Sequence, residues 1–305
     1  YDSYEDILAC GRTPSTELDE VQAEVGHRLK LWETAHQWLG ECYKWMRTPL
    51  QEVNAAGVLK RVAELRSEAH VAQEALEPNP VVEELQLHLT LMQDIMPVVV
   101  ALQNKDLKAR HWQSVSEIFQ SQLENTPSQS LLMGSIAELD VGRFYGDIQA
   151  ISIRATQENF IECALADLEK QWETMEFTIV IVETEKREVP TLGPTDAIEA
   201  QLEDSLVAVS MALSSRYAQV HFQAASDWQH RLKAVRNLLD ELEVMQKQGS
   251  YLGQVFAVTD IQKQLLSEAN RFAIVDNTWK TLLTDLQSSP NVLRAATPAL
   301  VERLR

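Results

Sequence analysis

The chain has 305 residues, of which 45% are hydrophobic, so it can bury one extended core or several smaller ones. Its 45 acidic and 27 basic residues give a formal net charge of −18. This charge repels phosphate backbones and argues against a nucleic-acid partner. The sequence starts at Tyr1 and stops within an expected helix at Arg305, so we expect both ends to lie inside a longer polypeptide.

The cysteines and the hydropathy of the sequence indicate the cellular compartment and whether the chain could cross a membrane. The three cysteines, Cys10, Cys42 and Cys163, are far apart and form no CxxC pair, which indicates a reducing compartment rather than a disulfide framework or zinc ribbon. The longest apolar run, Ile95 to Leu102, has eight residues and contains Pro97. A membrane span needs about 20 residues. We therefore expect no membrane partner.

Three helices are predicted in the first third of the chain. Apolar residues at steps of three and four indicate a first helix that begins near Thr16 and ends before Pro49. A second helix is expected over residues 51–76, and a third over residues 81–102, bent or broken near Pro97. The apolar stripe of the first helix, which we expect a neighbouring helix to cover, consists of Leu18, Val21, Val25, Leu29, Trp32, His36 and Leu39.

The remaining chain continues this pattern with one interruption. The longest predicted helix covers residues 144–175, and a β-branched alternating run then indicates a β-hairpin at about residues 177–192. A helix follows from Thr195, the pattern breaks at Gln248–Gly249, and a last long segment starts at Thr259. The sequence thus predicts an all-α fold, an elongated array of antiparallel helical bundles with one small β-hairpin.

A search for chemistry yields no candidate catalytic, cofactor-binding or metal-binding residue. Glu24 with His27, and Glu33 with His36, have the Glu-x-x-His spacing of di-iron bundles, but the two pairs project from opposite sides of one helix. We therefore expect surface Glu/His pairs and a half-buried His36. Cys163 has no histidine near it in sequence, and no phosphate-binding loop or GxSxG motif occurs.

Tryptophan is frequent on the predicted helices. Large aromatic side chains between packed helices bury much apolar area, so we expect core residues rather than a ligand cage. The seven are Trp32, Trp38, Trp45, Trp112, Trp172, Trp228 and Trp279.

The most informative segment is Asn104–Trp112, where a polar turn follows the apolar run and a helix begins. We expect Asp106 to cap that helix, with Leu107 and His111 on its inner face. The segment resembles the DLK-x-RHW signature in the linker of dynein heavy chains, and the residues that match it are Asp106, Leu107, Lys108, Arg110, His111 and Trp112. Further blocks similar to that family are Gln157–Leu165 with Trp172, Leu202–Ser205, Ser214–Tyr217 with Trp228 and Leu232, Tyr251–Phe256, Asp260–Leu265 and Phe272–Trp279.

The resemblance implies a mechanical segment without chemistry of its own. Residues 1–80 would be tail/linker junction helices, and residues 81–305 the N-terminal and central part of the linker. ATP and Mg would bind in AAA+ ring modules outside this chain. The implied partners are that ring, intermediate or light chains upstream, and microtubules indirectly. Candidate hinge residues are Gly193, Gly249 and Gly253.

The implied location is the cytoskeleton, and more narrowly the axoneme of a cilium. The narrower expectation rests on departures from the family pattern. Leu242 and Gly249 stand where related linkers usually carry tryptophan, and Leu266 stands where they carry proline, which indicates a divergent member.

Two other classes share some of these features. A static cytoskeletal rod of spectrin or vinculin type would show the same apolar stripes and acidity, but it would not explain the ordered blocks after Asp106. An all-α enzyme is disfavoured, because the searches for a metal site and for a nucleophile both fail.

Overall fold

A computed structural model describes residue 7 and residues 16–119, 131–137, 141–184 and 187–304. The chain divides into two compact units, Tyr1–Thr156 and Gln157–Arg305, and each unit has its own hydrophobic core. The division falls within α7 (Tyr145–Glu173), which contributes Ile148 and Ile151 to the first core. The same helix contributes Leu165 and Trp172 to the second core.

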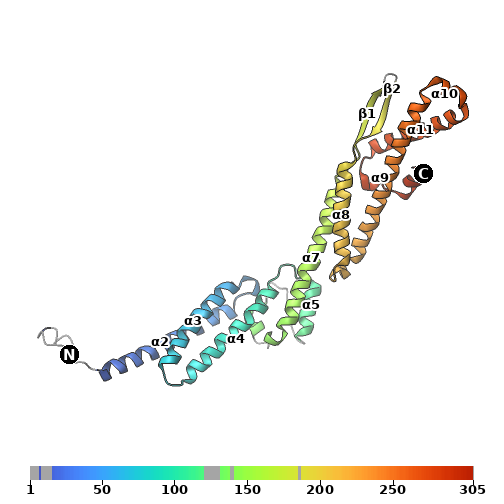
Figure 1. Ribbon diagram of the computed structural model, residues 1–305. Helices are drawn as coiled ribbons and strands as arrows, with labels where there is room; N and C mark the ends of the chain where they lie inside the picture. The colour runs from blue at the N-terminus through green and yellow to red at the C-terminus, as the bar shows by residue number, and fades with distance from the viewer. Residues whose placement is uncertain (1–6, 8–15, 120–130, 138–140, 185–186, 305) are drawn as a thin grey trace. The chain divides into compact units, whose positions relative to one another are not determined.

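Three long helices form most of the first unit, and they pack in the order of the sequence. α2 (Thr16–Met46) packs on α3 (Ala55–Ala75), and α3 packs on α4 (Pro80–Leu102), as Figure 1 shows for α3 and α4. The short helix η1 (Leu50–Glu52) lies between α2 and α3. α3 ends at Ala75, α4 begins at Pro80, and both helices contribute to the first core. The structure therefore shows no separate core on each side of residue 80, and the division there between a tail junction and a linker remains a sequence-based prediction.

α4 is more regular than its sequence predicted. It continues through Pro97 without interruption, so the predicted break is wrong, and the alternative of a bend remains a prediction. Among the described helices, α4 has the length and apolar composition that a membrane span requires, but core helices pass the same test. Eight of its side chains are buried, namely Val82, Leu85, Leu89, Met92, Met96, Val98, Val99 and Leu102.

The remaining elements of the first unit follow α4 in the chain, and α6 and η2 contact α4. α5 (Ala109–Ile118) follows the signature turn, and α6 (Met133–Ala137) contacts both α2 and α4. The short helix η2 (Val141–Phe144) leads into α7. Gln103 ties the end of α4 to the η1 region, because its Nε2 donates to the carbonyl oxygens of Leu50 and Val53, each at 2.7 Å.

The second unit contains the predicted hairpin between two long helices. β1 (Ile179–Thr184) pairs antiparallel with β2 (Arg187–Leu192), from Ile179 opposite Leu192 to Thr184 opposite Arg187. α8 (Asp196–Ser214), η3 (Ala218–Val220) and α9 (Phe222–Phe256) follow, and α8 and α9 pack side by side (Figure 1). The chain continues through α10 (Thr259–Gln264), α11 (Leu266–Ser288), α12 (Val292–Ala295) and α13 (Pro298–Leu304). The all-α prediction and the position of the hairpin are confirmed.

The predicted break at Gln248–Gly249 is wrong, because α9 is helical through both residues. Glycine in a helix interior costs only about 1 kcal/mol relative to alanine. The packed first half of α9, which buries Leu232, Val235 and Leu242, outweighs that cost. From residue 243 to residue 281, by contrast, no described side chain is buried. The helix therefore continues beyond the core that stabilises it.

The stripe predicted for the first helix is exposed, contrary to expectation. The buried residues of α2 are Leu31, Thr34 and Trp38, which lie on a different face. His36, expected to be half-buried, is exposed as well. Six of the seven tryptophans lie as expected in or against the cores, namely Trp38, Trp45, Trp112, Trp172, Trp228 and Trp279, whereas Trp32 does not.

Candidate functional site

The signature segment forms the turn between α4 and α5, and Asn104 organises it. The Asn104 side-chain amide donates to the Ser152 carbonyl at 3.0 Å, to Ser152 Oγ at 2.9 Å and to Thr156 Oγ1 at 2.8 Å. Its Oδ1 accepts the backbone N–H of Asp106 at 3.0 Å, which closes an Asx turn. One side chain thus shapes the turn and fastens it to α7.

The predicted N-cap at Asp106 is wrong, because α5 begins at Ala109, with Lys108 at the N-cap position. Asp106 lies within the turn that Asn104 closes, where the Leu107 N–H also donates to the Asn104 carbonyl at 3.2 Å, so the helix starts only after this turn. The backbone N–H of Lys108 donates to His111 Nδ1 at 3.0 Å. His111, which is 3% exposed, therefore acts as the acceptor that satisfies a backbone donor at the helix start.

The remaining signature residues line the first turns of α5. Leu107 and Trp112 are partly buried and pack against the first core, and Arg110 is half-buried. The segment therefore joins α4, α5 and α7 through packing and hydrogen bonds. Asn104 and His111 both bind backbone groups of this turn, and a structural role for the signature residues remains a prediction.

Trp112→Ala is expected to destabilise the first unit by about 1–3 kcal/mol, less than a fully buried tryptophan would, because part of the ring already contacts solvent. Urea denaturation followed by hydrogen exchange of α4 and α5 measures the change. Gln113→Ala, on the exposed neighbour, is the control and should leave the unit unchanged. A wild-type transition for Trp112→Ala would contradict this placement.

Of the three candidate hinge glycines, Gly193 is the one whose backbone lies close to another backbone segment, at Thr178. It follows β2 directly, and its N–H donates to the Thr178 carbonyl at 2.7 Å. A β-carbon on Gly193 would lie 2.9 Å from that same oxygen. The preceding residue is held as well, because Gln246 of α9 exchanges two hydrogen bonds with the Leu192 backbone, at 2.9 and 3.0 Å. The connection from the hairpin to α8 is therefore tightly fastened.

Gly249 and Gly253 lie inside α9 and have open surroundings. A β-carbon on Gly249 would meet nothing within 4 Å, and one on Gly253 would make an ordinary contact of 3.9 Å with the Phe272 ring. Neither residue is required by a turn. Bending at any of the three positions remains a prediction.

These surroundings predict opposite effects for the same substitution. Gly249→Ala should stabilise the second unit by up to about 1 kcal/mol, since alanine favours the helix. Gly193→Ala should destabilise it by about 1–3 kcal/mol, because the new methyl group overlaps a backbone oxygen. Urea midpoints of the two variants measured side by side test the contrast, and equal shifts in one direction would refute it.

Sequence reasoning missed three side chains that tie distant segments together. Gln103 and Gln246 carry no sequence signal, since glutamine is ordinary on helix surfaces. Asn291 does carry one, an asparagine directly before a short helix. Its Oδ1 caps α12 at Arg294 N, and its Nδ2 donates to the carbonyls of Trp172 and Glu173 at the end of α7, at 3.2 and 3.0 Å.

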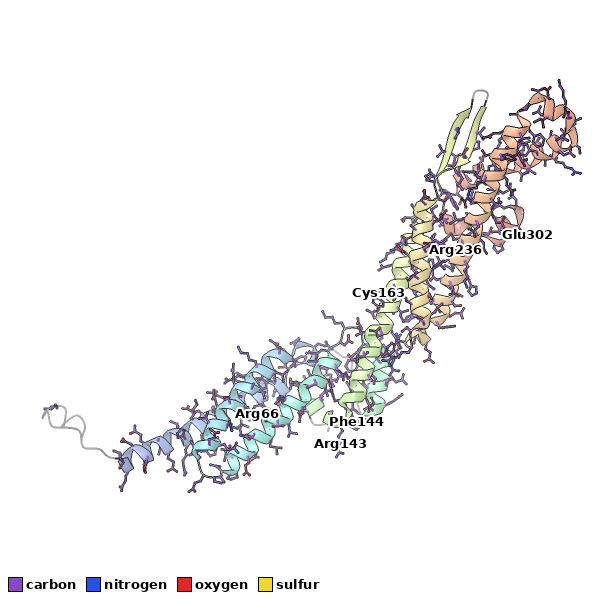
Figure 2. The ribbon with its side chains drawn as sticks, viewed as in Figure 1. Arg66, Arg143, Phe144, Cys163, Arg236 and Glu302 are labelled. Atoms are coloured by element: carbon purple, nitrogen blue, oxygen red, sulfur yellow. The ribbon has the colours of Figure 1, made fainter. Side chains whose placement is uncertain are left out.

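The described residues contain no group of three or more potential metal ligands. Cys163 is exposed on α7 (Figure 2), and burial raises the pKa of the Cys42 thiol. Cys10 lies outside the described residues. A groove between α8 and α9 is lined by Glu199, Glu203, Asp240 and Glu243, with Arg236 3.9 Å from Glu203. None of these positions combines a nucleophile with a base.

The protein is an all-α array of long helices, and polar side chains in the turns between helices, such as Asn104 and Asn291, hydrogen-bond to neighbouring helices. The model of the family described as dynein heavy chain, N-terminal region 2, matches residues 18–305. The chain therefore belongs to this dynein heavy chain family.

Individual relatives agree with the family match. Human dynein axonemal heavy chain 6 is 31% identical over 99% of this chain, and human dynein axonemal heavy chain 2 is 27% identical over 98%. Human dynein axonemal heavy chain 1 is 25% identical over 96%. The chain spans only 7% of the length of each of these three proteins.

Proposed function

We propose that this chain is a linker segment of a dynein heavy chain, a mechanical element that changes shape as downstream AAA+ modules hydrolyse ATP. Family membership across residues 18–305 carries the proposal. The presence of two separate cores supports it, because close-packed cores deform little and leave bending to the connections. The static rod is not favoured, since the family is one of motor heavy chains.

The remaining parts of the proposal follow from the family. ATP and Mg would act in ring modules outside this chain, and the segment itself would be non-catalytic. Its contacts would be the ring of its own heavy chain, intermediate or light chains upstream, and microtubules only through the rest of the motor. We further propose that the protein works in the cytoskeleton of the ciliary axoneme, and the axonemal names of the relatives support this location.

If this segment transmits force, a substitution in it can reduce movement along microtubules without stopping ATP hydrolysis in the ring. In the whole heavy chain, Gly193→Ala should lower microtubule gliding velocity while ATP turnover persists, because the variant strains the connection between the hairpin and α8. Gly249→Ala is the matched control and should preserve both. Unchanged gliding in Gly193→Ala, or equal loss of gliding and turnover, would count against the mechanical role of this connection.

A further inference from the structure

The two outer edges of the β-hairpin differ in their backbone groups. In an antiparallel pair, opposite residues alternate between those that exchange both backbone hydrogen bonds and those whose N–H and C=O groups point away from the partner strand. Gly193 donates to the Thr178 carbonyl at 2.7 Å, so these two residues form a hydrogen-bonded pair. The next pair, Ile179 with Leu192, is therefore of the other kind. The N–H and C=O groups of Leu192 accordingly point away from β1, and they bind the Gln246 side chain at 2.9 and 3.0 Å.

The outer edge of β2 is closed to a further strand. Leu192 at its end is already bound by Gln246, and Pro190, two residues earlier, has no N–H to donate. β2 is also the strand nearer α11 (Figure 1). A proline on an edge and a covering helix are both ways in which proteins prevent a sheet from adding strands.

The outer edge of β1 has neither kind of protection. Ile179 and Ile181 lie opposite Leu192 and Pro190, so the same alternation turns their N–H and C=O groups outward. Among the described residues, none hydrogen-bonds to these four groups. β1 therefore presents two donors and two acceptors along an extended backbone. The complement of this pattern is the backbone of another extended strand.

The side chains of β1 indicate which kind of strand fits beside it. Ile179 packs against the second core, whereas the side chains of Val180, Ile181 and Val182 are 43%, 54% and 46% exposed. Successive side chains of a strand point to opposite faces, so apolar surface is left in water on both faces of the hairpin. β-branched residues of a neighbouring strand would lie beside these side chains on each face.

We propose that the outer edge of β1 binds an extended, basic segment of a partner protein, rich in β-branched residues, which adds a third strand to the hairpin. Charge favours this occupant over a second copy of the chain, because a formal net charge of −18 repels another copy and attracts a basic segment. The other β-bridges of the described residues, Pro49 with Leu132 and Glu176 with Asn291, are isolated and supply no further strand. The pairing is separate from the proposed change of shape and does not depend on it.

Hydrogen exchange resolved to single residues tests the pairing in the motor complex isolated with its associated proteins. The Ile179 and Ile181 amides should exchange as slowly there as those of Val180 and Val182, which are bonded to β2. In heavy chain stripped of associated proteins at high salt, the first two amides should exchange about tenfold faster or more, while the other two stay slow. Fast exchange of Ile179 and Ile181 in the complex would overturn the proposal. Equal protection after stripping would also overturn it, because the cover would then belong to the heavy chain itself.

Two substitutions at one position separate backbone pairing from other forms of cover. Ile181→Pro removes an outward N–H without removing a bond to β2, and Pro190 already occupies the opposite position. In the complex, this variant should speed exchange of the Ile179 amide about tenfold or more. Ile181→Thr keeps both the N–H and the β-branched shape, and it should leave Ile179 protected. Continued protection of Ile179 in Ile181→Pro would contradict strand addition, since a cover that does not pair with β1 would be responsible.

Exchange of the Val180 and Val182 amides reports whether the hairpin itself is intact. If Ile181→Pro opens the hairpin, these amides become fast, and the unaltered heavy chain with and without its associated proteins decides the question. Protection of Ile179 that appears in stripped heavy chain as its concentration rises would identify a second copy as the occupant, against the proposal.

Discussion

Trp172→Ala is expected to destabilise the second unit by about 3–5 kcal/mol, the range for large-to-small changes of buried aromatic residues. The Trp172 side chain is 0% exposed and lies at the end of α7, among residues of α8, α9 and the C-terminal helices. Its Nε1 donates to the buried Ser205 Oγ at 2.9 Å. The substitution therefore creates a cavity and removes a buried hydrogen bond together.

Urea denaturation read by hydrogen exchange of peptides from residues 157–304 measures this loss without interference from the first unit. Phe160→Ala on the same helix is the matched control, because it removes a large aromatic side chain from a position that is 70% exposed and should change stability by less than about 0.5 kcal/mol. Ser205→Ala should cost about 1–3 kcal/mol, since it leaves the indole N–H without its acceptor and removes the hydroxyl's hydrogen bonds with Gln201. Similar values for Trp172→Ala and Phe160→Ala would show that the second core is placed wrongly.

Asn104→Asp is expected to destabilise the first unit by about 2–3 kcal/mol, a large effect for a change of one amide to a carboxylate. The aspartate keeps an acceptor for the Asp106 N–H but loses the donor that serves Ser152 and Thr156. It also places a charge beside the Ser152 carbonyl oxygen. Each lost hydrogen bond costs about 0.5–1.5 kcal/mol, and a charge in place of the donor beside the half-buried Ser152 carbonyl adds to that cost.

Hydrogen exchange of α5 and of residues 145–156 should accelerate together in Asn104→Asp, because the turn holds both. Lys105→Gln, at the exposed neighbouring position, is the control and should leave exchange at the wild-type rate. Faster exchange in α5 alone would mean that Asn104 shapes the turn without fastening it to α7.

The spacing of apolar residues predicted the long helices and the hairpin well. Both the helical spacing and the strand alternation indicate which face of the element is buried. It could not report what covers that face. The stripe of α2 from Leu18 to Tyr43 has the same pattern as the buried stripe of α9, yet only the latter has a partner among the described residues. Coverage depends on the rest of the polypeptide, which spacing does not encode.

Local signals failed where two of them competed. Asp106 has the chemistry of an N-cap, but it lies inside the turn that Asn104 closes, and His111 accepts the backbone N–H of Lys108 at the later start of the helix. Gly249 signals a helix end, but the packed half of α9 keeps the helix intact. The contacts of Gln103 and Gln246 join residues about 50 positions apart, so no local pattern reveals them.

Single-particle imaging of the whole heavy chain in different nucleotide states tests the central claim most directly. The account predicts that this segment is bent in one state and straight in another, while the first and second cores each keep their internal packing. The same segment shape in every nucleotide state, or a change that dissolves either core, would contradict it.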